Sequence, residues 1–358
     1  MLLRSFTRFF LSATPRRFLS IDVDTVNAVT LEDAENAVMS QLIPSEIEIS
    51  VSGDFVVNDI LDMILKYLGT VPADANSKYR KTSGPAILGG GEEATPEGES
   101  GGFGGVPSLL LPGRHLDLEL EDSDPRAVAY VAGAAPNSWG FLADGSTVAR
   151  RVSDADKKAS EYDRQRRAHP LFASAALSLV SEIANRRLFS TVRERKQLTY
   201  DANFSLTGFE RLKGGWFLVT VTASKEKARA ALEACKETLD ALRTTNPISP
   251  DNLESAKRVV LNRHEGDLRT SSYWASMMSG MQEESIPLKG PLSVTDFHAV
   301  IEGLTTRDLQ LTLECMGMGE GELYTAIGQT VRPVGLVDDG IVKASPMAGM
   351  GRGGALKN

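Results

Sequence analysis

The sequence is poor in the residue types that build metal sites and disulfide frameworks. Among its 358 residues, the cysteines and histidines are Cys235, Cys315, His115, His169, His264 and His298. Two isolated cysteines give no disulfide framework, so each is interpreted as a small buried hydrophobe in a reducing compartment. No histidine belongs to an HxxEH or HExxH pair, the spacings at which peptidase helices present zinc ligands. The sequence therefore predicts no metal site in this chain.

Other catalytic and binding signatures are also missing. The nearest approach to a zinc pair is His264-Glu265, but the residue at the second histidine position is Leu268. His264 falls on the inward face of a predicted helix and is interpreted as a core histidine. There is no Gly-x-Ser-x-Gly elbow, and the glycine-rich stretch 84–107 has no GxxxxGK[ST] sequence for a phosphate.

Charge and hydropathy exclude two further classes. The 39 basic residues are outnumbered by 47 acidic ones, which gives a net charge of -8, and the basic clusters are short. This balance argues against nucleic acid as the main partner. No apolar run approaches the ~20 residues that a membrane helix needs. A length of 358 residues is enough for two domains of ordinary size, and a hydrophobic content of 42% is typical of a globular protein.

Three segments are set apart by composition. Residues 1–20 hold four arginines, three serines, two threonines and four phenylalanines, without an acidic residue. This is typical of an organelle transit peptide, although a truncated start inside a longer protein remains an open alternative. Residues 76–110, rich in glycine and glutamate, are predicted to be a flexible linker, and residues 333–358 a flexible tail.

The stretch from His169 to Ser224 organises the rest. Its first part has the helical period, with apolar residues at three- to five-residue steps: Phe172, Ala175, Ala176, Leu179, Ile183 and Leu188. Two alternating segments follow, separated by a turn at 208–215, and these predict a β-hairpin. Strands are also predicted from His115 and at 126–136, the latter central in its sheet. Strands and helices in separate runs indicate an α+β fold with a mostly antiparallel sheet.

A short unit occurs twice. A helix opened by Thr30 and a strand ending at Gly53 recur as a helix opened by Thr305 and a strand reaching Gly328, both at an offset of 275 residues. Asp33 stands three residues after Thr30, which predicts a reciprocal cap of the helix. The recurrence predicts a duplicated domain, of which residues 25–75 represent only the C-terminal tail of the first copy.

Arg193 and Tyr200 are the candidate site residues. They lie seven positions apart, where the helix gives way to the hairpin. An arginine can grip carbonyl or carboxylate oxygens, and a tyrosine hydroxyl can donate to an oxygen that becomes negatively charged. Neither activates water at neutral pH. From chemistry alone, a surface arginine beside a strand tyrosine is the simpler interpretation.

A resemblance to a known family favours a functional role for Arg193 and Tyr200 over this simpler interpretation. The segment LFSTVRERKQLTY within 169–206, together with AYVAGAAPNSWGF and AKRVVLNRHEGDL, resembles the C-terminal half of pitrilysin-type (M16, inverzincin) metallopeptidases. Within the family, it most resembles the plastid peptidases that process imported precursor proteins. The similarity covers residues 25–72 and 115–330, and it identifies 111–332 as an M16 C-terminal domain.

The resemblance implies a specific division of labour. Enzymes of this family consist of two halves, each with two α+β domains, that close over a peptide. The N-terminal half holds the zinc motif, and the C-terminal half contributes an arginine and a tyrosine that fall on Arg193 and Tyr200. This sequence departs from the family at Gln197, where a glycine is usual.

Two functions are compatible with this sequence. In the first, the chain is the substrate-binding C-terminal half of a zinc metalloendopeptidase that acts on precursor proteins. It would bind no cofactor itself, would need a covalent or docked zinc-bearing N-terminal half, and would be inactive alone. In the second, it is a non-catalytic peptide-binding or scaffold subunit. The resemblance implies the plastid stroma as the location, with the mitochondrial matrix as the alternative.

Overall fold

The computed structural model describes residues 23–41, 49–69, 115–121, 126–142, 144–208, 214–279, 292–319 and 321–331. Their helices and strands are, in chain order, α2 (Val23–Ala28), α3 (Leu31–Gln41), α4 (Val57–Tyr67), β1 (His115–Glu121), β2 (Ala127–Ala135), α6 (Val148–Ala155), α7 (Glu161–Arg167), α8 (Phe172–Leu188), the π-helix η3 (Phe189–Arg195), β3 (Asp201–Gly208), β4 (Gly215–Ala223), α9 (Lys225–Arg243), α10 (Pro250–Asp267), α11 (Ser271–Met278), α12 (Leu292–Thr295), α13 (Phe297–Gly303), α14 (Thr306–Glu314) and β5 (Tyr324–Val331). The segments 1–20, 76–110 and 333–358, for which a leader, a linker and a tail are predicted, lie outside these residues.

One five-stranded sheet forms the base of the main domain, in the order β1-β5-β2-β4-β3. The β1–β5 pair is parallel and the other three pairs are antiparallel. β2 is the middle strand, and most of its residues are buried. The predicted α+β class and the central position of β2 are confirmed. None of the described helices combines the length and hydropathy that a membrane crossing requires.

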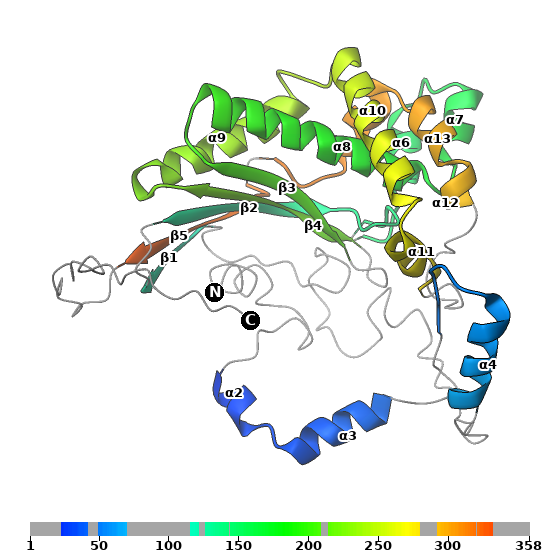
Figure 1. The fold of residues 1–358 in the computed structure, drawn as a ribbon. Coiled ribbons are helices and arrows are strands. Elements are labelled where there is room, and N and C mark those ends of the chain that lie inside the picture. The colour runs from blue at the N-terminus through cyan, green and yellow to red at the C-terminus, as the bar shows by residue number, and fades with distance from the viewer. Residues whose placement is uncertain are drawn as a thin grey trace, which may run out of the picture.

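Helices α8 and α9 lie against one face of the sheet and form the base of a second, helical layer (Figure 1). Alternate residues of β4 are buried, which is the pattern of a strand with one face against other elements. All six residues predicted to face inward on α8 are buried. Burying one leucine or isoleucine side chain contributes about 1.5–3 kcal/mol, so this helix is a main source of the domain's stability.

The duplicated unit is visible in the helix caps. The Asp308 N–H donates to Thr305 Oγ1 at 3.2 Å, and the Thr305 N–H donates to Asp308 Oδ2 at 3.1 Å. Thr30 and Asp33 make the same two bonds, at 3.1 and 3.0 Å. The cap predicted for Thr30 and Asp33 is therefore confirmed, and the second copy repeats it. The strand predicted in the first copy is not confirmed, because its described residues, 49–53, form no strand. A strand is stable only beside other strands.

A buried ionic network joins α7 to α14. The polar, charged run at residues 149–168 forms most of α6 and all of α7. Arg166 and Arg167 of α7 donate to the two carboxylate oxygens of Asp308, at 2.7 and 2.8 Å. Arg167 also donates to Asp156 at 3.0 Å. Burial opposes the charged form of Arg167, but the bonds to Asp308 and Asp156 outweigh it and raise the pKa.

We predict that Asp308→Asn destabilises the main domain by about 3–5 kcal/mol, the usual effect of removing one partner from a buried ion pair. The substitution leaves the buried guanidinium of Arg167 facing a neutral amide, and it also weakens the α14 cap. Urea unfolding measured by tryptophan fluorescence reports the change, because the three tryptophans belong to the main domain: Trp139, Trp216 and Trp274.

Asp33→Asn is the matched control, because Asp33 makes the same helix cap but is exposed. This variant should leave the fluorescence-detected transition within about 0.5 kcal/mol of the parent, as surface substitutions usually do. A loss of less than about 1 kcal/mol in Asp308→Asn would show that the buried ionic network contributes little to the stability of the main domain.

Candidate functional site

A π-helical turn carries the first candidate residue. α8 ends at Leu188 and continues directly into η3, where backbone N–H groups bond five residues back instead of four. The Lys196 N–H closes the turn on the Thr191 carbonyl at 3.1 Å. Val192 is fully buried and anchors the turn to the core. The hydrophobic period predicted an ordinary helix here, so the π-helix was missed.

Arg193 is exposed on this turn. Its guanidinium lies over the Phe189 ring, 4.8 Å from the ring centre. Such an exposed cation–π contact contributes about 0.5–1 kcal/mol and leaves the donor groups of the guanidinium free. Within the described part of the chain, no carboxylate pairs with Arg193. The side chain is therefore held over an aromatic ring while its hydrogen-bond donors face solvent.

Gln197 shapes the turn between the two candidate residues. Its φ is 51°, the only positive value for a non-glycine residue in the described ranges. Its carbonyl accepts a hydrogen bond from Lys227 Nζ at 3.0 Å, which ties the turn to α9. Glycine adopts this backbone conformation without steric cost, whereas a residue with a Cβ does not. The departure at Gln197 thus preserves the left-handed turn but strains it.

Tyr200 lies at the start of the hairpin. Its backbone N–H donates to the Thr222 carbonyl at 3.1 Å, while the residue as a whole is 76% exposed. The neighbouring Thr199 is buried, and its Oγ1 lies 2.6 Å from the Asp201 carbonyl oxygen and 2.5 Å from that of Thr222. These contacts fix the backbone on both sides of Tyr200, so the phenol is presented outward from a rigid strand end.

The two predicted site residues therefore share one short, well-anchored segment. Both side chains are exposed, and no hydrogen bond or ring contact joins them. The arrangement presents one guanidinium and one phenol hydroxyl, both of which are able to donate hydrogen bonds. On this chain alone, the residues form an open surface.

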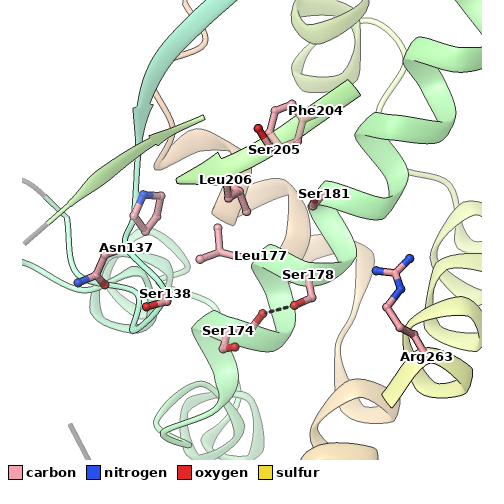
Figure 2. Close-up of a pocket in the computed structure, with 11 residues that line it drawn as sticks. Asn137, Ser138, Ser174, Leu177, Ser178, Ser181, Phe204, Ser205, Leu206 and Arg263 are labelled. Carbon is pink, nitrogen blue, oxygen red and sulfur yellow. Dashed lines mark hydrogen bonds between the residues drawn. The ribbon is translucent and has the colours of Figure 1, made fainter. Parts of the chain in front are cut away.

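A cavity of about 480 Å³ lies at the other end of the β3–α8 seam. Figure 2 shows serines of α8 facing Ser205 and Leu206 of β3, with Arg263 of α10 at one side. The lining residues are Pro136, Asn137, Ser138, Ser174, Leu177, Ser178, Ser181, Phe204, Ser205, Leu206 and Arg263. Ser178 Oγ donates to the Ser174 carbonyl at 2.9 Å, and Arg263 pairs with Glu182 at 3.0 Å. Sequence reasoning did not single out this hydroxyl-rich site.

Asn185 joins α8 to β3 at Phe204, which also lines this cavity. Its Nδ2 donates to the Phe204 carbonyl at 2.8 Å, and the Phe204 N–H donates to its Oδ1 at 2.7 Å. β3 is an edge strand, so these backbone groups would otherwise be open to another chain. The side-chain amide takes the place of a neighbouring strand and holds α8 against β3.

The histidines do not fit a zinc site. His169 Nε2 lies 3.2 Å from Asp296 Oδ2. The His264 ring centre lies 4.2 Å from that of Phe297, with the ring planes tilted by 36°, and burial lowers the pKa of His264. Across the described ranges, no group of three or more histidine, cysteine, aspartate or glutamate side chains could hold a metal ion. No catalytic step can therefore be derived through a metal bound to these residues.

Comparisons with known proteins place this geometry in a family. Residues 163–260 match the family described as the peptidase M16 inactive domain. The chloroplastic stromal processing peptidase of Pisum sativum is 36% identical over 324 residues, which cover 87% of this chain and 24% of the relative. The Arabidopsis thaliana protein of the same name is 34% identical over 327 residues, with the same coverage. The chain spans about a quarter of the length of these curated relatives.

Solved structures show the same fold. A protease from Helicobacter pylori aligns with a TM-score of 0.57 at 14% identity, covering 91% of this chain and 70% of that one. The periplasmic protease PqqL from Escherichia coli aligns with a TM-score of 0.55 at 12% identity, covering 92% of this chain and 30% of that one. The sequence matches and the shared fold together show that this chain carries an M16 peptidase domain of the C-terminal, inactive type and is related to the stromal processing peptidases.

Proposed function

We propose that this chain is the substrate-binding C-terminal half of a zinc metalloendopeptidase that processes imported precursor proteins. The observation that carries the proposal is the anchored turn that presents Arg193 and Tyr200 to solvent at the positions where the family's substrate residues fall. The similarity to stromal processing peptidases over 87% of the chain supports the substrate class. The names of those relatives, chloroplastic stromal processing peptidases, support a proposed location in the plastid stroma.

The two side chains would have different roles. The Arg193 guanidinium would hold carbonyl oxygens of an extended peptide in the ground state and the transition state alike. The Tyr200 hydroxyl would donate to the carbonyl oxygen as it gains negative charge. The nucleophilic water and the zinc would belong to the N-terminal half, since the described residues of this chain do not fit a zinc site.

The duplicated unit supports the need for such a partner. At the offset of 275 residues, α2 and α3 correspond to α13 and α14. Leu304 is 1% exposed, whereas its counterpart Val29 is 55% exposed. Asp308 is buried against two arginines, whereas Asp33 is exposed. The first copy therefore exposes a surface whose counterpart in the second copy is covered by helices and a pair of arginines. We propose that helices of the preceding domain cover this surface.

A second function follows from the same fold. The matched family is described as the inactive M16 domain, and an exposed peptide-binding turn without a metal site suits a non-catalytic scaffold subunit equally well. Precursor cleavage by the assembled complex distinguishes the two functions. A complex with a zinc-bearing half that cleaves precursor supports the first, and a stable complex that binds precursor without cleavage supports the second.

In the assembled, zinc-bearing enzyme, we predict that Tyr200→Phe lowers kcat on the order of 10²-fold with little change in KM, because it removes one donor to the charged oxygen. Arg193→Ala should raise KM at least as much as it lowers kcat, because it removes ground-state binding. Steady-state cleavage of a precursor measures both effects.

Tyr162→Phe is the control for the tyrosine variant, because Tyr162 is also largely exposed, at 70%, but lies on α7 away from the turn. It should cleave precursor at the parental rate. Parental rates for both site variants would refute the assignment of the two residues. Unfolding of both variants would instead show that the pair has a structural role.

A third variant tests the geometry of the turn. Gln197→Gly should stabilise the main domain by about 0.5–1 kcal/mol, because glycine relieves the cost of the left-handed conformation but loses more chain entropy. Gln197→Ala retains a Cβ and should give no gain. The measurement is the urea midpoint of this chain. A loss of stability in both variants would mean that the glutamine side chain itself makes the contacts that hold the turn.

A further inference from the structure

A second, smaller cavity lies beside the π-helical turn, between η3 and α9. Its volume is about 200 Å³, which is several times the ~30 Å³ that one water molecule occupies in the liquid. The lining residues are Arg187, Thr191, Arg195, Lys196, Glu237, Thr238, Ala241, Leu242 and Asn246. Three of these side chains are cationic and one is anionic, although the whole chain has a net charge of -8.

The two arginines of this cavity are bonded only to neutral groups. Arg187 Nη2 donates to Asn252 Oδ1 at 2.5 Å and approaches the Pro247 carbonyl at 3.4 Å. Arg195 Nη2 donates to Thr191 Oγ1 at 2.6 Å. Neither guanidinium has a carboxylate partner in the described part of the chain. Among the described residues, neither guanidinium therefore forms an ion pair; Arg187 is half-buried, whereas Arg195 is exposed to solvent.

The single acid of the cavity does not change this balance. Glu237 pairs with Lys196 at 2.7 Å, so these two charges offset each other. Burial lowers the pKa of Arg187, and the nearby positive charge of Arg195 lowers it further. An anion between the two guanidinium groups would replace this repulsion with charge-assisted hydrogen bonds from two planar forks.

We propose that this cavity is a binding site for a small oxyanion of the phosphate class, held by Arg187 and Arg195. A tetrahedral anion offers several acceptor oxygens, so it can accept hydrogen bonds from two guanidinium groups at once. The cavity volume accommodates such an ion with a few water molecules and is too small for a folded partner. The proposal does not depend on the peptidase assignment.

Isothermal titration of the full chain with inorganic phosphate tests the site directly. Calorimetry is preferred to thermal shift, because phosphate also stabilises proteins through exclusion from their surface. Saturable binding is expected at constant ionic strength. Arg195→Gln should weaken the affinity at least tenfold, because a hydrogen bond to a charged group is lost. Arg195→Lys should recover part of this loss, because it restores the charge without the fork.

Arg186→Gln is the matched control. Arg186 precedes Arg187 on α8, but it pairs with Glu182 and does not line the cavity. This variant should bind phosphate as the parent does. Three outcomes would overturn the proposal: no saturable binding, equal affinity in the parent and Arg195→Gln, or acetate binding as tightly as phosphate. The last would identify a peptide carboxylate as the source of the anion.

Discussion

The carboxylate of Asp308 is the constraint on which the helix layer depends. It caps α14 by accepting the Thr305 N–H, and it also accepts hydrogen bonds from Arg166 and Arg167. The last contact spans 141 positions of sequence. This contact holds α7, the helix directly before α8, against α14 near the C-terminal end of the domain. The position of α8, and of the π-helical turn that continues from it, follows from this buried network.

A second constraint fixes the other side of α8. Asn185 binds both backbone groups of Phe204, and the Phe204 ring stacks 5.5 Å from that of Phe217. The helix is thereby registered on the edge strand by hydrogen bonds and not only by apolar contact. Because η3 begins four residues later, this register also sets where Arg193 emerges. The candidate site is thus a consequence of how one helix is held along one strand.

The sequence predicted what local periodicity and capping encode, and it missed what depends on distant partners. The buried face of α8, the hairpin, and the cap of Thr30 with Asp33 were predicted, because each follows from residues close in sequence. The π-helix was not, because the hydrophobic period does not report a change in hydrogen-bond register. The burial of Arg166 and Arg167 was also missed, since arginines in a polar run are usually exposed unless a distant carboxylate pairs with them.

The two copies of the capping unit show this limit within one chain. Thr30 with Asp33 and Thr305 with Asp308 form the same cap with nearly the same distances, so the local sequence is sufficient for the cap. Yet Asp308 is fully buried, whereas Asp33 is exposed, so burial comes from the elements packed around the unit. Because a carboxylate loses solvation on burial, Asp308 is favourable there only with its arginines. Whatever covers α3 in the assembled protein must therefore leave Asp33 in solvent or bring a cation to it.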